Sequence, residues 1–155
     1  MTIVEKETGN AHRAEISRVS DYELTSLSRE RYFFDWTTEQ RNEVYKLHKT
    51  TSSEALGLIS INRIQSEWRI HIRLLTVSKE NKGNNKIFDR IAGNLIAYIS
   101  KLALRDYGEL ACVSLKPKSK LIEHYITTYH MAARGNLLSL EVPEILNLVN
   151  EYDDE

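Results

Sequence analysis

The segment IHIRLLTV-SKENKGNNK-IFDRIAGNLIAYISKLA, residues 70–103, decides the fold because it reads as a strand, a polar turn and a long helix. Alternate residues of the strand 70–77 share a face, and the helix 87–103 carries two adjacent apolar stripes. Where a glycine-containing turn meets a helix, free backbone N–H groups and the helix dipole favour an anion such as phosphate. We therefore expect a ligand at the turn 78–86.

The flanking strands extend this unit to a mixed sheet. The apolar run 110–115 is typical of a strand buried on both faces, and its order after 70–77 and the helix predicts a right-handed parallel crossover. Upstream, a strand beginning at Val44 and a second at 55–61 are joined by hairpin-length turns, which predicts three antiparallel neighbours. The expected fold class is α/β, with a mixed, mostly antiparallel sheet and helices on both faces.

The remaining segments complete one domain over residues 1–155, of which we expect 1–12 to be frayed and flexible. Ser20-Asp21 offers a helix N-cap, and Pro117 and Pro143 each mark the start of a later helix. The other predicted elements are strands at 14–19 and 137–142, a helix that buries Leu121, Ile122, Tyr125 and Tyr129, and a C-terminal amphipathic helix.

The composition is that of an ordinary globular protein, 41% hydrophobic and 28% charged. The formal net charge of −1 gives no general attraction to nucleic acid or an anionic membrane, so we expect neither as a partner. The single cysteine, Cys112, excludes an internal disulfide framework and is expected to be inert core. Neither a signal region nor a run near the ~20 residues of a membrane helix is present, which predicts a cytoplasmic protein.

Residues 43–142 resemble the GNAT superfamily of acetyl-CoA-dependent N-acetyltransferases. In that family a strand ending in Val-x-Pro leads, two residues later, into Arg-Gly-x-Gly-x-Gly at a helix start. The corresponding residues here are Val77, Lys82, Gly83, Asn85 and Ile87. Asparagine tolerates a left-handed backbone and isoleucine does not, so a longer loop that brings Ala92-Gly93 to the small positions is a second possible register. Both registers stay open at this point.

The resemblance implies that acetyl-CoA is the cosubstrate, that no metal takes part, and that the turn and helix start hold the pyrophosphate. The residues it assigns to the cofactor are Leu75, Thr76, Val77, Lys82, Gly83, Asn84, Asn85, Lys86 and Ile87. Without the resemblance, the same residues would be interpreted as a solvated, lysine-rich turn.

Acetyl transfer to an amine requires a base, because an alkylammonium with a pKa near ~10.4 is not a nucleophile. Glu67 and His71 both have odd residue numbers, on or just before the strand, so their side chains could project to the same side of it. Either residue could then take the proton directly or through water. Each residue also has an interpretation without catalysis: Glu67 would be an exposed turn residue, and His71 a half-buried strand histidine that makes one hydrogen bond. The departing CoA thiolate needs a proton, and Tyr125 occupies the place of the tyrosine that the family commonly uses, although it also fits the core stripe of its helix.

Two hypotheses follow. The first is an N-acetyltransferase that acts by direct attack of a small-molecule or peptide amine in a ternary complex, with the aromatic cluster Tyr32, Phe33, Phe34 and Trp36 lining the acceptor pocket. The second is a GNAT-like binding or interaction module without catalysis, which the missing glycines at Asn85 and Ile87 and the shortened last hairpin favour. A homodimer would cover an exposed strand edge near the C-terminus.

Overall fold

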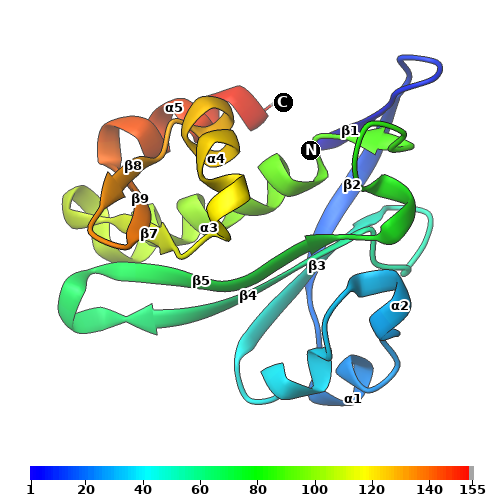
Figure 1. Cartoon of the computed structure of the whole chain (residues 1–155), viewed down its shortest axis with the longest axis horizontal. Coiled ribbons are helices and arrows are strands. Elements are labelled where there is room, and N and C mark those ends of the chain that lie inside the picture. Colours follow the sequence, from blue (N-terminus) through cyan, green and yellow to red (C-terminus); the bar gives the residue numbers. More distant parts are fainter. Residues whose placement is uncertain (154–155) are drawn as a thin grey trace. The chain divides into compact units, whose positions relative to one another are not determined.

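Two long neighbouring strands, β4 (Gly57–Ile64) and β5 (Arg69–Val77), form the middle of the structure's sheet order (Figure 1). The computed structural model describes residues 1–153, which divide into two compact units. Of the described residues, one unit comprises 1–60 and 74–95, and the other comprises 61–73 and 96–153. Both strands therefore contribute residues to each unit.

In the first unit the strands follow the order β6-β1-β2-β3-β4-β5. Their bounds are β1 Thr2–Glu5, β2 Ala11–Arg18, β3 Glu43–Lys49 and β6 Phe88–Asp89. β1 pairs antiparallel with both β2 and β6, and β2 pairs antiparallel with β3. The expectation that the first residues are frayed is wrong for β1, because its backbone pairs with two strands and the side chain of Ile3 is fully buried.

Short helices cover part of this sheet and bury the aromatic cluster. They are α1 Asp21–Leu24, α2 Arg29–Tyr32, and the 3₁₀ turns η1 Trp36–Glu39 and η3 Lys79–Asn81. Ser20 and Ser28 cap α1 and α2 by accepting hydrogen bonds from backbone N–H groups. The Tyr32 hydroxyl donates to the Ala55 carbonyl at 2.7 Å, and the Trp36 indole N–H donates to the Tyr32 carbonyl at 3.1 Å. These bonds fix α2 within a core cluster.

The sheet of the second unit has one apolar and one polar face. Its strand order is β5-β7-β9-β8, with β7 Cys112–Leu115, β8 Ala132–Arg134 and β9 Leu137–Glu141. β5 and β7 are parallel, which confirms the predicted parallel pairing, and the pairs β7–β9 and β8–β9 are antiparallel. The apolar face consists of buried residues that the register places together: Ile70, Ile72, Val113, Leu115, Leu138 and Leu140.

Three longer helices follow the strands: α3 Ile91–Tyr107, α4 Ile122–Tyr129 and α5 Val142–Tyr152. The 3₁₀ turns η2 Gln65–Glu67, η4 Gly108–Leu110 and η5 Ser119–Leu121 lie between elements. Within residues 1–153, no helix has the length and apolar character needed to cross a membrane.

Two helix predictions need correction. α3 begins at Ile91, four residues later than expected, because Phe88 pairs with β1 and the Ile87 N–H donates to the Glu80 carbonyl at 3.2 Å. The prediction that Leu121 and Ile122 are buried is also wrong, since their exposed fractions are 36% and 38%. Leu121 belongs to η5 and Ile122 is the first residue of α4, so both lie at the start of the helix, whereas the buried Tyr129 lies at its end.

Gly57 allows the first turn of α3 to pack closely on β4. A Cβ at this position would lie 2.5 Å from Cγ2 of Ile91 and 2.9 Å from Cδ1 of Leu95. Both distances are shorter than van der Waals contact, so the absence of a side chain at Gly57 fixes the distance between the strand and the helix start.

Candidate active site

The polar face of the second unit brings His71 beside Ser114. Parallel pairing of β5 and β7 places the two residues opposite each other, and the His71 Nδ1 atom lies 2.9 Å from the Ser114 hydroxyl. The hydroxyl also accepts a hydrogen bond from Nη1 of Arg69 at 2.6 Å. Because Ser114 is only 1% exposed, its hydroxyl is a fixed partner that orients the imidazole ring.

The surroundings of His71 favour its neutral form. Partial burial lowers the pKa of His71 below its ordinary value of 6.5, and the positive charges of Arg69 and Arg73 lower it further. At neutral pH the imidazole is therefore uncharged and can accept a proton.

Glu67 occupies a different environment from His71. It lies in η2 before the strand, is exposed, and accepts hydrogen bonds from Arg69 Nε at 3.0 Å and Nη2 at 2.8 Å. The predicted pair of bases is thus connected by a chain of contacts through Arg69 and Ser114. Since its carboxylate is bound by a guanidinium, Glu67 is the weaker candidate for a base.

Tyr125 lies on α4 and is half-buried. Its ring packs against the rings of His124 and Tyr129, with centroid distances of 5.7 and 5.9 Å. Burial raises the pKa of the Tyr125 phenol, so its hydroxyl keeps its proton at neutral pH. The residue can therefore belong to the helix packing and still donate a proton.

Of the residues assigned to the cofactor, Leu75, Thr76 and Val77 form the end of β5. They follow the segment Arg69–Ile72, which pairs with β7. Thr76 is buried, and its hydroxyl donates to the Val77 carbonyl at 3.0 Å.

The assigned residues Lys82, Gly83, Asn84, Asn85, Lys86 and Ile87 form a loop that returns to β6, so they do not open a helix. Asn81 closes the base of this loop, because its side-chain oxygen accepts a hydrogen bond from the Phe88 N–H at 2.8 Å. Lys82 lies over the Phe33 ring at 4.2 Å, and Lys86 pairs with Asp89 at 3.0 Å. Gly83 has a φ of +82°, which explains a glycine at this turn.

The helix start lies at the residues of the longer-loop register. Arg90 has a left-handed backbone with φ of 76°, and α3 opens with Ile91, Ala92 and Gly93. The Asn94 side chain donates to the Arg90 carbonyl at 2.7 Å, which stabilises this turn. Sequence reasoning assigned no role to Arg90 or Asn94; the Ala92-Gly93 pair was the signal that pointed to this position.

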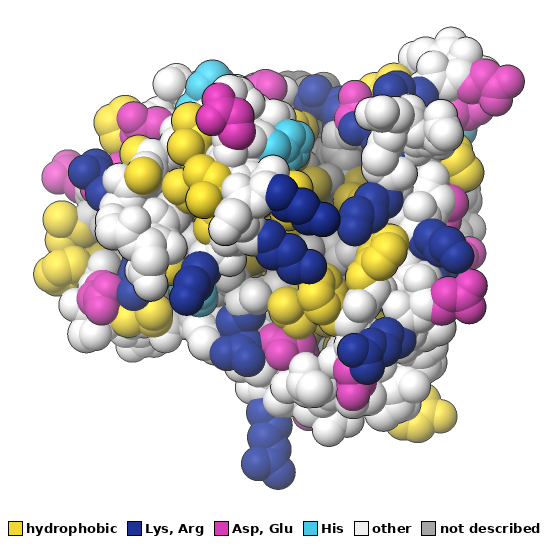
Figure 2. Space-filling view, in the orientation of Figure 1, with side chains coloured by type: hydrophobic (Ala, Val, Ile, Leu, Met, Phe, Trp, Pro, Cys, Tyr) yellow, Lys and Arg dark blue, Asp and Glu magenta, His cyan; other side chains and the backbone are white. Residues whose placement is uncertain are grey.

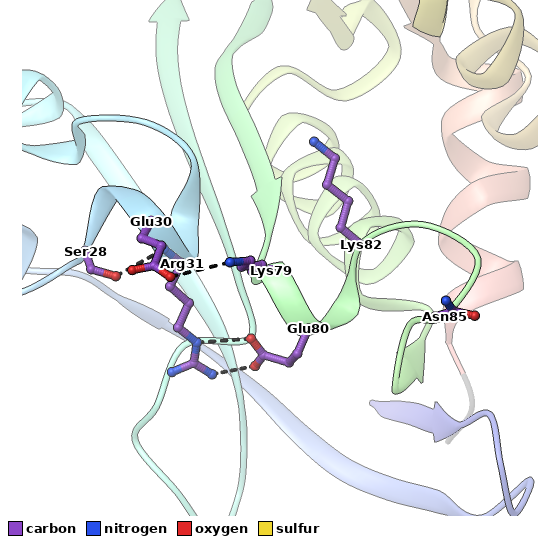
Figure 3. A pocket seen from close by; sticks show the side chains of 7 residues that line it. All are labelled: Ser28, Glu30, Arg31, Lys79, Glu80, Lys82 and Asn85. Carbon is purple, nitrogen blue, oxygen red and sulfur yellow. Dashed lines mark hydrogen bonds and ion pairs between the residues drawn. The ribbon is translucent and has the colours of Figure 1, made fainter.

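A first hollow, with a volume of ≈ 620 Å³, lies between α2 and the segment 79–85 (Figure 3). Its lining residues are Ser28, Glu30, Arg31, Lys79, Glu80, Lys82 and Asn85. Arg31 donates to both carboxylate oxygens of Glu80, from Nη2 at 2.6 Å and Nε at 3.2 Å. These hydrogen bonds raise the pKa of Arg31 above its ordinary value. Burial raises the pKa of Glu80, but the hydrogen bonds from Arg31 outweigh it, and the pKa of Glu80 lies below its ordinary value.

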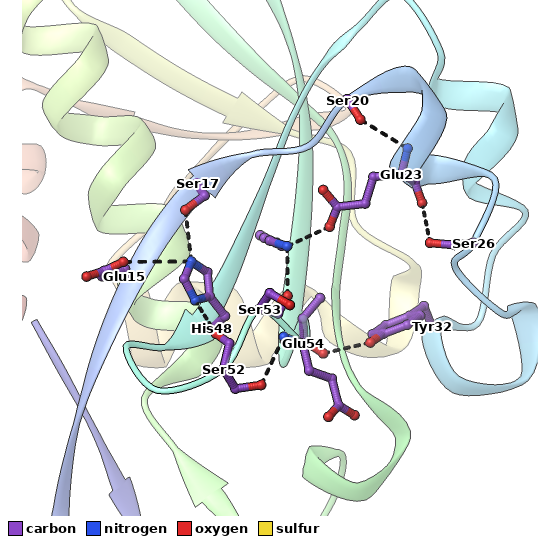
Figure 4. Close-up of polar contacts among 12 residues, drawn as sticks. Glu15, Ser17, Ser20, Glu23, Ser26, Tyr32, His48, Ser52, Ser53 and Glu54 are labelled. Carbon is purple, nitrogen blue, oxygen red and sulfur yellow. Dashed lines mark hydrogen bonds and ion pairs between the residues drawn. The ribbon is translucent and has the colours of Figure 1, made fainter.

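A second hollow of ≈ 560 Å³ shares Ser28 and Arg31 with the first and is also lined by Lys46 and Glu23. Figure 4 shows the polar contacts of Glu23 and Tyr32. Lys46 is 8% exposed, and its ammonium donates to Glu23 at 2.6 Å and to the Ser53 carbonyl at 2.7 Å. Tyr32 lines this hollow, whereas Trp36 is fully buried in the core cluster. The aromatic cluster therefore contributes mainly to packing.

Lys and Arg side chains are prominent on the face drawn in Figure 2, although the formal net charge of the chain is −1. Among residues 1–153, no group of three or more His, Cys, Asp or Glu side chains is arranged to hold a metal ion.

The fold matches solved structures of N-acetyltransferases. Mutant forms of the spermidine/spermine N-acetyltransferase SpeG from Vibrio cholerae superpose with a TM-score of 0.63 at 10% identity, covering 87% of this chain and 97% of theirs. The chain has the GNAT fold. Within this fold, an acetyltransferase from Bacillus subtilis in complex with CoA gives a TM-score of 0.57 at 14% identity, covering 84% of this chain and 99% of that one.

The ribosomal-protein-S18-alanine N-acetyltransferase from Escherichia coli, with the same GNAT fold, gives a TM-score of 0.60 at 8% identity and covers 83% of this chain and 94% of its own. No protein-family model and no curated protein sequence matches the chain significantly. Its likeness to these GNAT proteins therefore lies in the fold, while its sequence has diverged.

Proposed function

We propose that this protein is an N-acetyltransferase that transfers the acetyl group of acetyl-CoA to an amine. The observation that carries the proposal is a neutral, half-buried histidine, His71, oriented by buried Ser114 on a strand of a GNAT fold. Two structural neighbours with this fold are named as N-acetyltransferases, and a third, named as an acetyltransferase, is in complex with CoA.

The reaction requires two proton transfers, for which the second unit supplies candidate residues. The amine nitrogen attacks the thioester carbonyl carbon, a C–N bond forms, and the C–S bond breaks. His71 takes the proton from the amine, directly or through water, and the Tyr125 hydroxyl donates a proton to the departing thiolate. No covalent enzyme intermediate is needed, because the acetyl group passes directly within a ternary complex.

The cofactor's pyrophosphate is proposed to bind the backbone N–H groups at the start of α3, from Ile91 to Gly93. α3 has 17 residues, so its N-terminus carries a substantial dipole charge. Loop residues 82–87, with Lys82 and Lys86, supply additional positive charge beside the first hollow, and Leu75 to Val77 offer backbone groups to the pantetheine arm. The exposed edge strand β8 is proposed to be covered in a homodimer.

Isothermal titration with acetyl-CoA and with CoA tests cofactor binding, and mass spectrometry of a panel of amines incubated with acetyl-CoA tests transfer. We expect micromolar binding of both ligands and a mass increase of one acetyl group in the preferred amine. The neighbours named for spermidine and spermine and for an alanine of ribosomal protein S18 indicate that the panel should contain polyamines and peptides. Absence of binding by either ligand would support the non-catalytic module instead.

The Tyr125→Phe variant tests the proton donor because it removes the hydroxyl and keeps the ring. We expect kcat to fall by about 10²-fold with unchanged CoA affinity. Tyr129→Phe is the matched control on the same helix. Equal turnover by the wild type and Tyr125→Phe would remove Tyr125 from the mechanism.

The missing glycines do not favour a non-catalytic module, because Asn85 and Ile87 lie in the loop before β6 and not at the start of a helix. The amine panel decides between the two functions, since a module that kept the cofactor site would bind CoA without acetylating an amine.

A further inference from the structure

The second hollow, of ≈ 560 Å³, has a wall that internal hydrogen bonds hold in place. This wall is the turn between β3 and β4. The Lys46 ammonium donates to the Ser53 carbonyl of the turn at 2.7 Å, and the Tyr32 hydroxyl donates to the Ala55 carbonyl at 2.7 Å. Lys46 is 8% exposed and Tyr32 is 5% exposed, so neither side chain has to be ordered when a ligand enters. The hollow is therefore preformed, as small-molecule sites usually are.

The charged groups of this hollow can each make a further hydrogen bond. Within residues 1–153, the Lys46 ammonium has two acceptors, Glu23 at 2.6 Å and the Ser53 carbonyl. An ammonium has three protons, so one remains for a ligand. Glu23 binds Lys46 through one carboxylate oxygen, and Glu54 binds Arg31 through one. The second oxygen of each carboxylate can therefore accept from a ligand.

Three hydroxyl groups that line the hollow add both kinds of hydrogen-bonding group. Tyr32 and Ser26 donate their protons to backbone carbonyls at 2.7 Å, which leaves their oxygens as acceptors. The Ser28 oxygen accepts from the backbone N–H of Arg31 at 3.1 Å, which leaves the Ser28 proton as a donor. A ligand in the hollow thus meets donors and acceptors together.

The charges that line the hollow are paired with one another, Lys46 with Glu23 and Arg31 with Glu54. A charged ligand would add a charge without a partner beside the buried Lys46, which is costly. An ammonium group can only donate, and a carboxylate can only accept, so either would match only some of the lining groups. A neutral hydroxyl group both donates and accepts. Several hydroxyls on one uncharged ligand would match the hollow best.

We infer that the second hollow binds a neutral, polyhydroxylated ligand such as a sugar, with the Lys46 ammonium and the Glu23 carboxylate as its central contacts. The inference goes beyond acetyl transfer and does not depend on it.

The first experiment follows the backbone amide signals of Ser26 and Ser53 in ¹H–¹⁵N NMR during titration with sugars. The neutral probes are glucose, galactose, mannose and ribose, and the charged probes are glucosamine in its ammonium form and glucuronate. We expect at least one neutral sugar to shift both signals with a Kd in the millimolar range, and both charged sugars to bind about tenfold more weakly. No shift with any neutral sugar, or equal binding by a charged sugar, would overturn the inference.

The double variant Lys46→Met/Glu23→Leu separates ligand binding from a purely structural role. It removes both central contacts without leaving a buried charge unpaired. We expect the Kd for the best neutral sugar to rise about tenfold, the effect of losing a charge-assisted hydrogen bond. Lys101→Gln is the matched control, since it removes a lysine charge at an exposed position of α3 that does not line the hollow. It should leave the Kd unchanged.

Ser26→Ala is the second variant, because it removes only one hydroxyl from an exposed residue and should fold like the wild type. We expect it to raise the Kd about threefold through the loss of one neutral hydrogen bond. Wild-type affinity in either variant would overturn the inference. The titrations contain no acetyl-CoA, so a negative result would leave the acetyltransferase proposal intact, and absence of CoA binding would leave this inference intact.

Discussion

The two units differ in what lies beside their cations. In the first unit, Arg31 pairs with Glu80 and Glu54, and Lys46 pairs with Glu23. In the second unit, neutral His71 lies between two arginines on its own strand. Paired charges hold elements together, whereas a neutral, half-buried base beside positive charge is suited to chemistry. Substitutions should therefore affect stability in the first unit and activity in the second.

The largest effect should come from His71→Gln. Loss of the base should lower kcat/KM for the amine at pH 7 by about 10²-fold, with the melting temperature and CoA affinity unchanged. Ser114→Ala, which removes only the partner of His71, should cause a smaller loss. Steady-state kinetics and calorimetry measure both quantities, and a large loss of CoA affinity in His71→Gln would contradict this division of roles.

Lys46→Met should have the largest effect on stability. It removes a buried cation and leaves Glu23 and the Ser53 carbonyl without their ammonium donor. Because Glu23 is partly exposed, we expect a loss of about 2 kcal/mol, or roughly 4–8 °C in melting temperature. The double variant Lys46→Met/Glu23→Leu should recover part of that loss, and failure to recover any would show that the ion pair is not the cause.

A smaller effect is expected at the first hollow. Arg31→Lys keeps the charge but loses the two-point contact with Glu80, at a cost of about 1 kcal/mol. Lys79→Ala removes a 3.4 Å pair with Glu30 between exposed side chains and should change stability by less than about 0.5 kcal/mol. Urea unfolding of the two variants provides the comparison; equal losses would show that geometry does not determine the contribution of these pairs.

The smallest expected effect is a shift in pH dependence. The pKa of His71 lies below 6.5, so kcat/KM should fall only as the pH drops through that lowered value and the base becomes protonated. Arg73→Gln removes one of the positive charges, which raises the pKa of His71 and moves this fall to higher pH. Lys101→Gln should leave the profile in place. A shift to lower pH in Arg73→Gln would contradict the electrostatic argument.

The parallel unit from β5 through α3 to β7 was predictable because its apolar residues follow strand and helix periods. The start of α3 was not, because Phe88 and Ile91 are both buried and continue the apolar stripe across β6. β1 was missed because pairing with β2 and β6 is a tertiary effect that a polar terminal sequence does not display.

From the sequence, candidate residues of the site could be predicted, but not their partners. The alternation of strand residues placed His71 on one face, and only the register of β5 with β7 showed that Ser114 is its partner. The burial of Lys46 could not be predicted, since a lysine in a strand is normally expected to face solvent. The roles of Glu67, His71 and Tyr125, and those of the cofactor residues, remain predictions, of which His71→Gln and Tyr125→Phe test two.

The closed base of the loop 82–87 makes it a place where the chain can be lengthened. Asn81 and Glu80 hold its two ends through the N–H groups of Phe88 and Ile87, and Gly83 has open space around it. Doubling the length of a flexible loop costs only about 0.6 kcal/mol in closure entropy. A short peptide carrying a fluorophore, inserted after Gly83, would therefore leave β6 in place and provide an optical reporter beside the first hollow.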